Sequence, residues 1–177
     1  MENKETEIAG SRRLVVMGVS GCGKSEIGQR LASRLGVEYL EGDAFHPAAN
    51  VARMSAGIPL DDDDRSGWLT ILGERISAAR TAGHGLVLSC SSLKRRYRDQ
   101  LRAADPDLVF IHLHGDRETI ASRMHARPGH FMPPALLDSQ LRDLEPLQPD
   151  EKGLQEDIRL SPDEMIARIL EQCRNIQ

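Results

Sequence analysis

The sequence predicts an α/β protein built on a parallel five-stranded sheet with helices on both faces. Short apolar runs alternate with amphipathic helical segments along the chain, and this alternation is typical of parallel strands joined by right-handed helical crossovers. The first apolar run leads directly into a glycine-rich loop at residues 18–25. At 177 residues the chain is long enough for one domain with a full core and short for two.

The glycine-rich loop is the strongest functional signal. Glycines let backbone N–H groups turn toward a phosphate, and the helix that follows directs its positive end at the same anion. Lys24 is expected to reach the β- and γ-phosphates of ATP, and Ser25 to bind Mg²⁺. The chain is therefore predicted to be a P-loop NTPase. The loop fits G-x-x-x-x-G-K-[ST], with Gly18, Gly23, Lys24 and Ser25 at the fixed positions and Val19, Ser20, Gly21 and Cys22 between them.

The individual elements follow from apolar spacing and from capping residues. Continuous apolar runs predict buried strands, and apolar residues repeated every three or four positions predict helices. Asp116 and Ser161 are expected to start two helices as N-caps, and Pro47 suits the first turn of another. The strands are expected at residues 14–17, 37–41, 86–88, 108–113 and 154–158. Four helices are expected between residues 24 and 36, 47 and 57, 65 and 83, and 93 and 102. Three more are expected, one that begins after residue 116, one that ends at residue 144 and one that begins at residue 161.

Composition narrows the classes of partner. The net charge is −4, which argues against a nucleic-acid or anionic-membrane partner. No apolar run approaches the 18 residues of a membrane span. Three widely spaced cysteines form no disulfide or zinc pattern, so a reducing, cytoplasmic compartment is expected. Residues 1–10 are polar and are expected to form a flexible tail, with residues 11–177 as a single domain.

Three loops are expected to meet at one site, because ligands of parallel sheets bind at the carboxyl ends of the strands. The phosphate loop with Lys24 and Ser25 follows the first strand, the loop after the second strand carries Asp43 and His46, and the loop after the third strand spans residues 89–98.

A GTPase is disfavoured: the D-x-x-G match at 64–67 follows an acidic loop rather than a strand, and no N-K-x-D guanine motif is present.

Several joined motifs follow the phosphate loop in order. They are G-D-x-x-H-P-x-x-N at 42–50, M-x-x-G-x-P-L-x-D-x-D-R-x-x-W-L at 54–69, C-S-x-L-K-x-x-Y-R-D-x-L-R at 90–102, R-x-x-H-F-M at 127–132, L-L-x-S-Q at 136–140 and L-E at 144–145. With these motifs the chain resembles the gluconate kinases over most of its length, from the phosphate loop to about residue 146. Gly67 stands where the family usually has proline and Ser92 where it often has alanine. The C-terminal fifth matches poorly, so the adenine contacts stay undefined.

The resemblance implies a core like that of nucleoside monophosphate kinases and shikimate kinases. A substrate-binding insert would span about 44–82 and a lid about 123–134. It implies transfer of the γ-phosphoryl group of ATP to the terminal (6-) hydroxyl of D-gluconate, and family members tend to form homodimers. The alternatives are a related kinase for another hydroxy acid such as shikimate, or a non-catalytic nucleotide-binding regulator.

Three residues at or just after the end of the second strand have two interpretations each. Asp43 is expected to accept the proton of the acceptor hydroxyl, or else to cap a helix or turn. Glu41 either holds a water on Mg²⁺ or is a solvated charge at the end of the strand. His46 either hydrogen-bonds sugar hydroxyls or caps the helix after Pro47.

Gluconate carries a carboxylate, which we expect cationic side chains to bind. Arginine suits this role because its planar guanidinium donates two parallel hydrogen bonds to a carboxylate. Arg65 is the first candidate, by motif and by analogy with shikimate kinases, and Lys94 and Arg98 are next; an exposed basic helix face is their alternative interpretation. The acidic run at residues 61–64 is interpreted as a solvated helix start rather than a metal site, with Asp62 or Asp64 steadying Arg65.

The lid is expected to act by excluding water and supplying positive charge. Arg123 and Arg127 are expected to stabilise the charge that develops during transfer, with surface arginines as the alternative. His130, in the same motif as Arg127, is assigned to substrate binding by the resemblance. Cys22 either packs within the loop or has a lowered pKa and is reactive.

Overall fold

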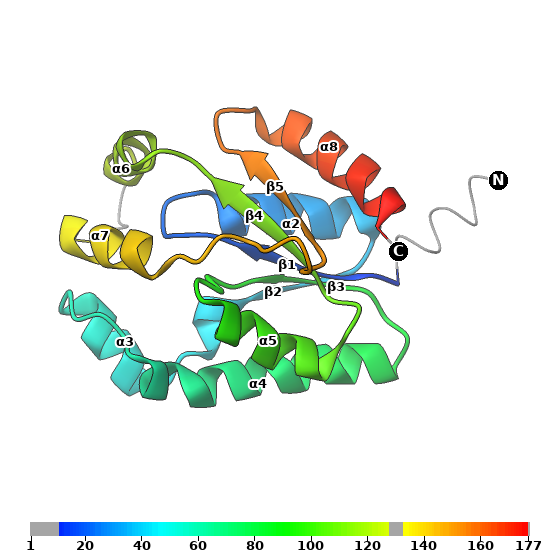
Figure 1. Ribbon diagram of the computed structural model, residues 1–177, viewed down its shortest axis with the longest axis horizontal. Coiled ribbons are helices and arrows are strands. Elements are labelled where there is room, and N and C mark those ends of the chain that lie inside the picture. The colour runs from blue at the N-terminus through cyan, green and yellow to red at the C-terminus, as the bar shows by residue number, and fades with distance from the viewer. Residues whose placement is uncertain (1–10, 128–132, 177) are drawn as a thin grey trace.

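The computed structural model describes residues 11–127 and 133–176. Its centre is a five-stranded sheet in the order β2-β3-β1-β4-β5 with every neighbouring pair parallel (Figure 1). Val15 in the central strand pairs with Leu88 on one side and Phe110 on the other. The predicted parallel five-stranded sheet is therefore confirmed. The strands are β1 (Arg13–Met17), β2 (Glu38–Glu41), β3 (Leu86–Ser89), β4 (Val109–His114) and β5 (Gly153–Asp157).

Helices cover both faces of the sheet, as predicted. Helices α2 (Lys24–Leu35) and α8 (Pro162–Asn175) lie on one face, and α4 (Asp62–Thr81) and α5 (Arg95–Ala104) lie on the other (Figure 1). The remaining elements gather beyond the carboxyl ends of the strands, where the phosphate loop also lies (Figure 1). They are the short 3₁₀ helix η1 (Gly42–Phe45) and helices α3 (Ala48–Ser55), α6 (Arg117–His125) and α7 (Pro134–Asp143).

The core has two layers because alternate residues of a strand point to opposite faces. In β1, Leu14 and Val16 pack in the layer under α2 and α8, whereas Val15 and Met17 pack with Trp68 in the layer under α4 and α5. Both layers consist mainly of leucine, isoleucine and valine, as a chain with 3% aromatic residues requires. Because all neighbouring strands are parallel, their carboxyl ends lie along one edge of the sheet, and the loops of the site follow these ends.

Most helix ends follow the predicted caps. The Asp116 side chain accepts a hydrogen bond from the Thr119 N–H at 2.8 Å, and Ser161 forms a capping box at the start of α8. Pro47 is the N-cap of α3, one residue before the predicted first turn. The acidic run lies at a helix start, as predicted, but the helix begins three residues earlier than expected, because Asp61 caps α4 in a second capping box and residues 62–64 form its first turn. Among the described residues, no helix is long and apolar enough to cross a membrane.

Candidate active site

The phosphate loop turns tightly between β1 and α2. Gly18 has φ 144°, and a Cβ at this position would lie 2.7 Å from the Leu113 carbonyl oxygen and 2.8 Å from Cys22 Sγ, so only glycine fits without displacement. Lys24 Nζ donates to the Val19 carbonyl at 2.9 Å, which folds the lysine back over its own loop. Cys22 is completely buried, which favours the interpretation that its side chain packs within the loop.

A hydrogen-bond network joins the start of α2 to β2 and β3. Ser25 Oγ donates to Glu41, and the Tyr39 hydroxyl lies 2.7 Å from Glu41 Oε2 and 2.8 Å from Ser89 Oγ. Burial is the main reason that the pKa of Tyr39 rises to about 12, so this hydroxyl stays protonated. The network holds the Glu41 carboxylate beside the hydroxyl that the loop motif assigns to Mg²⁺. Within the described part of the chain, no three His, Cys, Asp or Glu residues cluster as a protein-only metal site.

Asp43 projects from η1 at the carboxyl end of β2. The preceding Gly42 packs so closely on β3 that a Cβ would lie 2.2 Å from the Ser89 carbonyl oxygen. The Asp43 side chain is 70% exposed, and its carboxylate lies 3.9 Å from His46 Nε2. At the starts of η1 and α3, neither Asp43 nor His46 caps the helix through its side chain.

His46 is held by an aromatic contact rather than by strong hydrogen bonds. Its ring stacks on the indole of Trp68 with centroids 4.0 Å apart, and Trp68 Nε1 donates to the Gly42 carbonyl at 2.8 Å. The stack therefore fixes His46 relative to the Asp43 turn. Burial lowers the pKa of His46, Asp43 opposes this effect and Arg65 adds to it, so the imidazole is neutral near pH 7.

Arg65 is buried with an incomplete set of partners. The residue is 7% exposed, its Nε has no hydrogen-bond partner among the described residues, and its guanidinium carbon lies 5.5 Å from the centre of the Tyr97 ring. An unsatisfied buried guanidinium is costly, so a ligand with acceptor oxygens is the natural complement.

The expectation that Asp62 or Asp64 steadies Arg65 is wrong. Asp62 is engaged by Lys94 at 3.2 Å and by Arg96 and the Tyr97 hydroxyl. Asp64 completes the capping box at the start of α4 and lies 3.4 Å from Arg53. Both carboxylates are therefore committed elsewhere, and Arg65 is left without either of them.

Lys94 and Arg98, the two further candidates for the gluconate carboxylate, have different surroundings. Lys94 is 22% exposed at its side chain and lies 5.8 Å from the centre of the Tyr97 ring that Arg65 also faces. Arg98 is fully buried and forms a two-pronged ion pair with Glu151. The expected contact between Arg98 and gluconate is therefore corrected: its donors point into the protein.

A cavity of about 320 Å³ opens beside the phosphate loop. Arg123, which lines this cavity, donates a hydrogen bond to the Ile158 carbonyl and so connects α6 to the end of β5. His130 lies outside the described residues. The cavity therefore joins the phosphate loop, the predicted lid and the loop before α8, the region for which the sequence predicted no contacts. Its walls include Gly21, Cys22, Gly23, Glu26, Arg123, Arg127, Leu160 and Pro162.

Sequence reasoning assigned no role to two residues that the structure places at the site. Gln140 of α7 accepts from the Ser20 N–H at 2.7 Å and donates to the Ser20 hydroxyl at 3.2 Å, so α7 contacts the phosphate loop. Trp68 of α4 packs in the core and also supports His46. Both residues belong to the quoted motifs, and that was the one available signal.

Known proteins resemble this chain over most of its length. A family model described as an AAA domain matches residues 14–147. The chain is 44% identical over 171 residues to a gluconokinase of Gluconobacter oxydans, covering 96% of each chain. It is 46% identical over 160 residues to the thermosensitive gluconokinase of Escherichia coli, covering 90% of this chain and 84% of the relative. A crystal structure of a gluconokinase from Sinorhizobium meliloti is similar with a TM-score of 0.82 and 43% identity, covering 92% and 95% of the two chains. The chain therefore belongs to the gluconokinase family of P-loop kinases.

Proposed function

We propose that this protein transfers the γ-phosphoryl group of ATP to the 6-hydroxyl of D-gluconate, giving 6-phospho-D-gluconate and ADP. The observation that carries the proposal is the buried Arg65 with its unpaired Nε, close enough to His46 to lower the pKa of that imidazole. His46 in turn neighbours the exposed Asp43 carboxylate. A cation for the acid end of the substrate and a base for its alcohol end therefore belong to one group of residues.

The phosphate loop holds the triphosphate. Lys24 exchanges its contact with the Val19 carbonyl for the β- and γ-phosphates. The donor set fits Mg²⁺, because Ser25 Oγ and the adjacent Glu41 carboxylate are hard oxygen ligands that act directly or through water. When bound, the ion neutralises charge on the phosphates.

The adenine base occupies the cavity beside the phosphate loop. Its volume of about 320 Å³ suits a planar base and ribose, and Arg123 and Pro162 contribute to its walls. Arginine stacks on flat aromatic faces through its planar guanidinium. Arg127 lines the same cavity just after α6, which supports its assignment to the phosphates.

Asp43 accepts the proton of the gluconate 6-hydroxyl late in the transfer. The Asp43 side chain is 70% exposed, and its carboxylate lies 3.9 Å from His46 Nε2, so it is available to a substrate alcohol. Neutral His46 offers one donor or one acceptor to a sugar hydroxyl at an orientation set by the Trp68 stack. Positioning and charge neutralisation then supply most of the rate.

Arg65 binds the carboxylate of gluconate, and Lys94, which also lies near Tyr97, assists it. Both cations lie within 6 Å of the centre of that ring, at 5.5 and 5.8 Å. A carboxylate bound there satisfies the Arg65 donors that the fold leaves without partners. This contact distinguishes an aldonic acid from a neutral sugar alcohol.

An ADP-release assay with Mg²⁺-ATP tests the proposal. Gluconate, shikimate, other aldonic acids and sorbitol are compared as acceptors at equal concentration. Gluconate is expected to give the highest kcat/KM, and Lys24→Ala is expected to abolish turnover with every acceptor. A protein that binds ATP without phosphorylating any acid would contradict the enzymatic proposal, and a preference for shikimate would contradict the substrate.

A further inference from the structure

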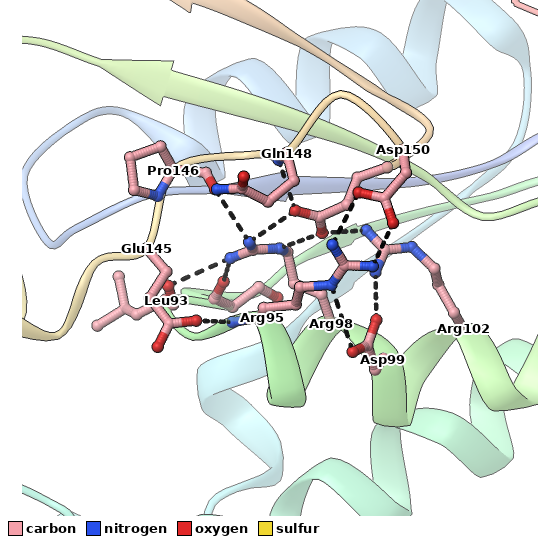
Figure 2. Close-up of polar contacts among 11 residues, drawn as sticks. Leu93, Arg95, Arg98, Asp99, Arg102, Glu145, Pro146, Gln148 and Asp150 are labelled. Carbon is pink, nitrogen blue, oxygen red and sulfur yellow. Dashed lines mark hydrogen bonds and ion pairs between the residues drawn. The ribbon is translucent and has the colours of Figure 1, made fainter.

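Arg98 is fully buried in α5, yet its donors are spread over two separate loops. Nε and Nη2 donate to the two Glu151 oxygens at 2.7 and 2.9 Å. Nη1 donates to the carbonyls of Ser92 at 3.0 Å and Leu93 at 3.2 Å, and Nη2 also reaches the Pro146 carbonyl at 3.4 Å. Figure 2 shows these hydrogen bonds and ion pairs between α5 and the two loops. All three nitrogens of the guanidinium are therefore used within the protein.

The first loop that Arg98 holds is the turn between β3 and α5, residues 90–94. Ser92 has φ 46°, and it is the one non-glycine residue with positive φ in the part of the chain that the structure describes. Such a conformation is unfavourable for an L-residue and persists only where the surroundings enforce it. The hydrogen bond from Arg98 to the Ser92 carbonyl supplies part of that enforcement.

This turn contacts the phosphate loop at one end and carries a substrate residue at the other. The Ser91 carbonyl accepts a hydrogen bond from the Gly18 N–H at 3.2 Å. Lys94, which we assign to the gluconate carboxylate, follows Leu93 directly. The end of the turn at the phosphate loop is also fixed by the hydrogen bond from the Cys90 N–H to the Val16 carbonyl at 3.1 Å. A change in the Ser92 and Leu93 carbonyls therefore displaces Lys94 more than it displaces the phosphate loop.

The second loop, residues 145–151, connects α7 to β5 and meets the same turn. The Glu145 N–H donates to the Leu93 carbonyl at 2.8 Å, and the Glu145 carboxylate accepts from the Arg95 N–H at 2.7 Å (Figure 2). Glu151 also accepts from Arg102 and from the Gln148 N–H. The Arg98–Glu151 pair thus joins the turn at residues 90–94 to the segment behind α7.

We propose that Arg98 is a positioning residue for phosphoryl transfer. It holds the turn at residues 90–94 so that Lys94 faces the gluconate carboxylate while the Ser91 carbonyl stays on the phosphate loop. The inference rests on the proposed function, because Lys94 is a substrate residue only if gluconate binds there. Arg98 itself does not touch the substrate.

Two variants separate positioning from stability. Arg98→Lys keeps a positive charge for Glu151 but lacks the fork that reaches the two carbonyls. Arg98→Met combined with Glu151→Met removes both charges, a change that often preserves stability because no buried charge is left unpaired. Arg95→Met is the matched control, since Arg95 lies on the same helix and pairs with Asp150 at the exposed surface.

Steady-state kinetics with gluconate and ATP varied separately give the readout, with the folded fraction of each variant measured by circular dichroism. Both variants are expected to raise KM for gluconate about tenfold while KM for ATP changes less than about threefold, because small displacements of a positioning group cost large factors. Arg95→Met should keep both constants within about twofold.

Unchanged KM for gluconate in Arg98→Lys, measured on folded protein, overturns the positioning role. An equal rise in both KM values also overturns it, because that pattern indicates general loosening of the fold. If the double variant does not fold, Arg98→Lys alone decides. Wild-type protein without gluconokinase activity overturns the proposed function and this inference together, whereas active wild type with unaffected variants overturns the inference only.

Discussion

Two buried arginines on neighbouring helices, Arg65 of α4 and Arg98 of α5, have opposite surroundings. Arg65 is 7% exposed, and its guanidinium makes no hydrogen bond or ion pair with any described residue. Arg98 is fully buried and has a carboxylate and three carbonyls as partners. Both belong to motifs of the gluconate kinase pattern, so the sequence alone assigned them the same role.

The difference between them separates folding from binding. A guanidinium whose donors are all used contributes to the folded state, whereas one that is buried without partners is completed only by a ligand. Substitutions in the Asp43 cluster (Asp43, His46 and Arg65) should therefore lower the activity of the protein but not its stability. Substitutions in the Arg98–Glu151 pair should lower its stability first.

The largest effect is expected on stability, from Glu151→Gln. This change leaves Arg98 buried without its counter-charge and should cost about 3–5 kcal/mol of unfolding free energy at pH 7. Burial alone would raise the pKa of Glu151, but hydrogen bonds from Arg98, Gln148 and Arg102 lower it from 4.5 to about 2. Urea denaturation at several pH values measures the cost.

The sign of the pH dependence follows from that lowered pKa. A carboxyl group with a depressed pKa in the folded state stabilises the protein above the unfolded pKa and loses this stabilisation as pH falls. The difference in unfolding free energy between wild type and Glu151→Gln should therefore be largest above pH 4.5 and should decrease toward pH 2. A gap that stays constant from pH 7 to pH 3 would mean that the carboxylate charge is not what stabilises this loop.

In the Asp43 cluster, Asp43→Asn should lower kcat by about 10² or more, which is about 3 kcal/mol in the barrier. ATP binding and the melting temperature should stay near wild type, because the side chain is 70% exposed and has no close partner. Equilibrium titration with ATP and steady-state kinetics check the two halves of this statement. A near-wild-type kcat would remove Asp43 as the base.

A somewhat smaller effect is expected for Arg65→Met. It should raise KM for gluconate about 30-fold and KM for ATP less than about threefold, since the lost contact is with the acid end of the acceptor. The melting temperature should stay the same or rise, because an unsatisfied buried charge is removed. A large fall in melting temperature with unchanged KM for gluconate would place Arg65 in the same structural class as Arg98.

Most of the fold was predictable because local signals agreed with tertiary packing. Apolar runs located all five strands to within a residue or two, and the caps at Asp116 and Ser161 were confirmed. Strand order was not predicted, because it depends on which strands pair across the sheet rather than on any local pattern. Pro47 was misplaced by one residue, an ordinary uncertainty at helix ends.

The site was only partly predictable from the same patterns. A motif lists which residue types recur, but it does not say which of them face a ligand. Arg65 and Arg98 show this limit, as does Asp62, which pairs with Lys94 and Arg96 rather than with Arg65. The contact of Gln140 with Ser20 joins residues 120 positions apart in the chain, and no local signal predicts such a pairing.

The smallest effect is expected for Asp150→Asn, the exposed counterpart of Glu151. Asp150 forms a two-pronged ion pair with Arg95 at 2.7 and 2.8 Å, so its distances match those of the Arg98 pair. Its side chain is 66% exposed, however, against 0% for Glu151. Water screens the exposed pair, and ordering two solvated side chains offsets much of the attraction. The substitution should leave the unfolding free energy close to that of wild type, and added salt should erase any difference. A cost that approached that of Glu151→Gln would mean that bond geometry, rather than burial, sets the strength of both pairs, and the contrast between Arg65 and Arg98 would lose its basis.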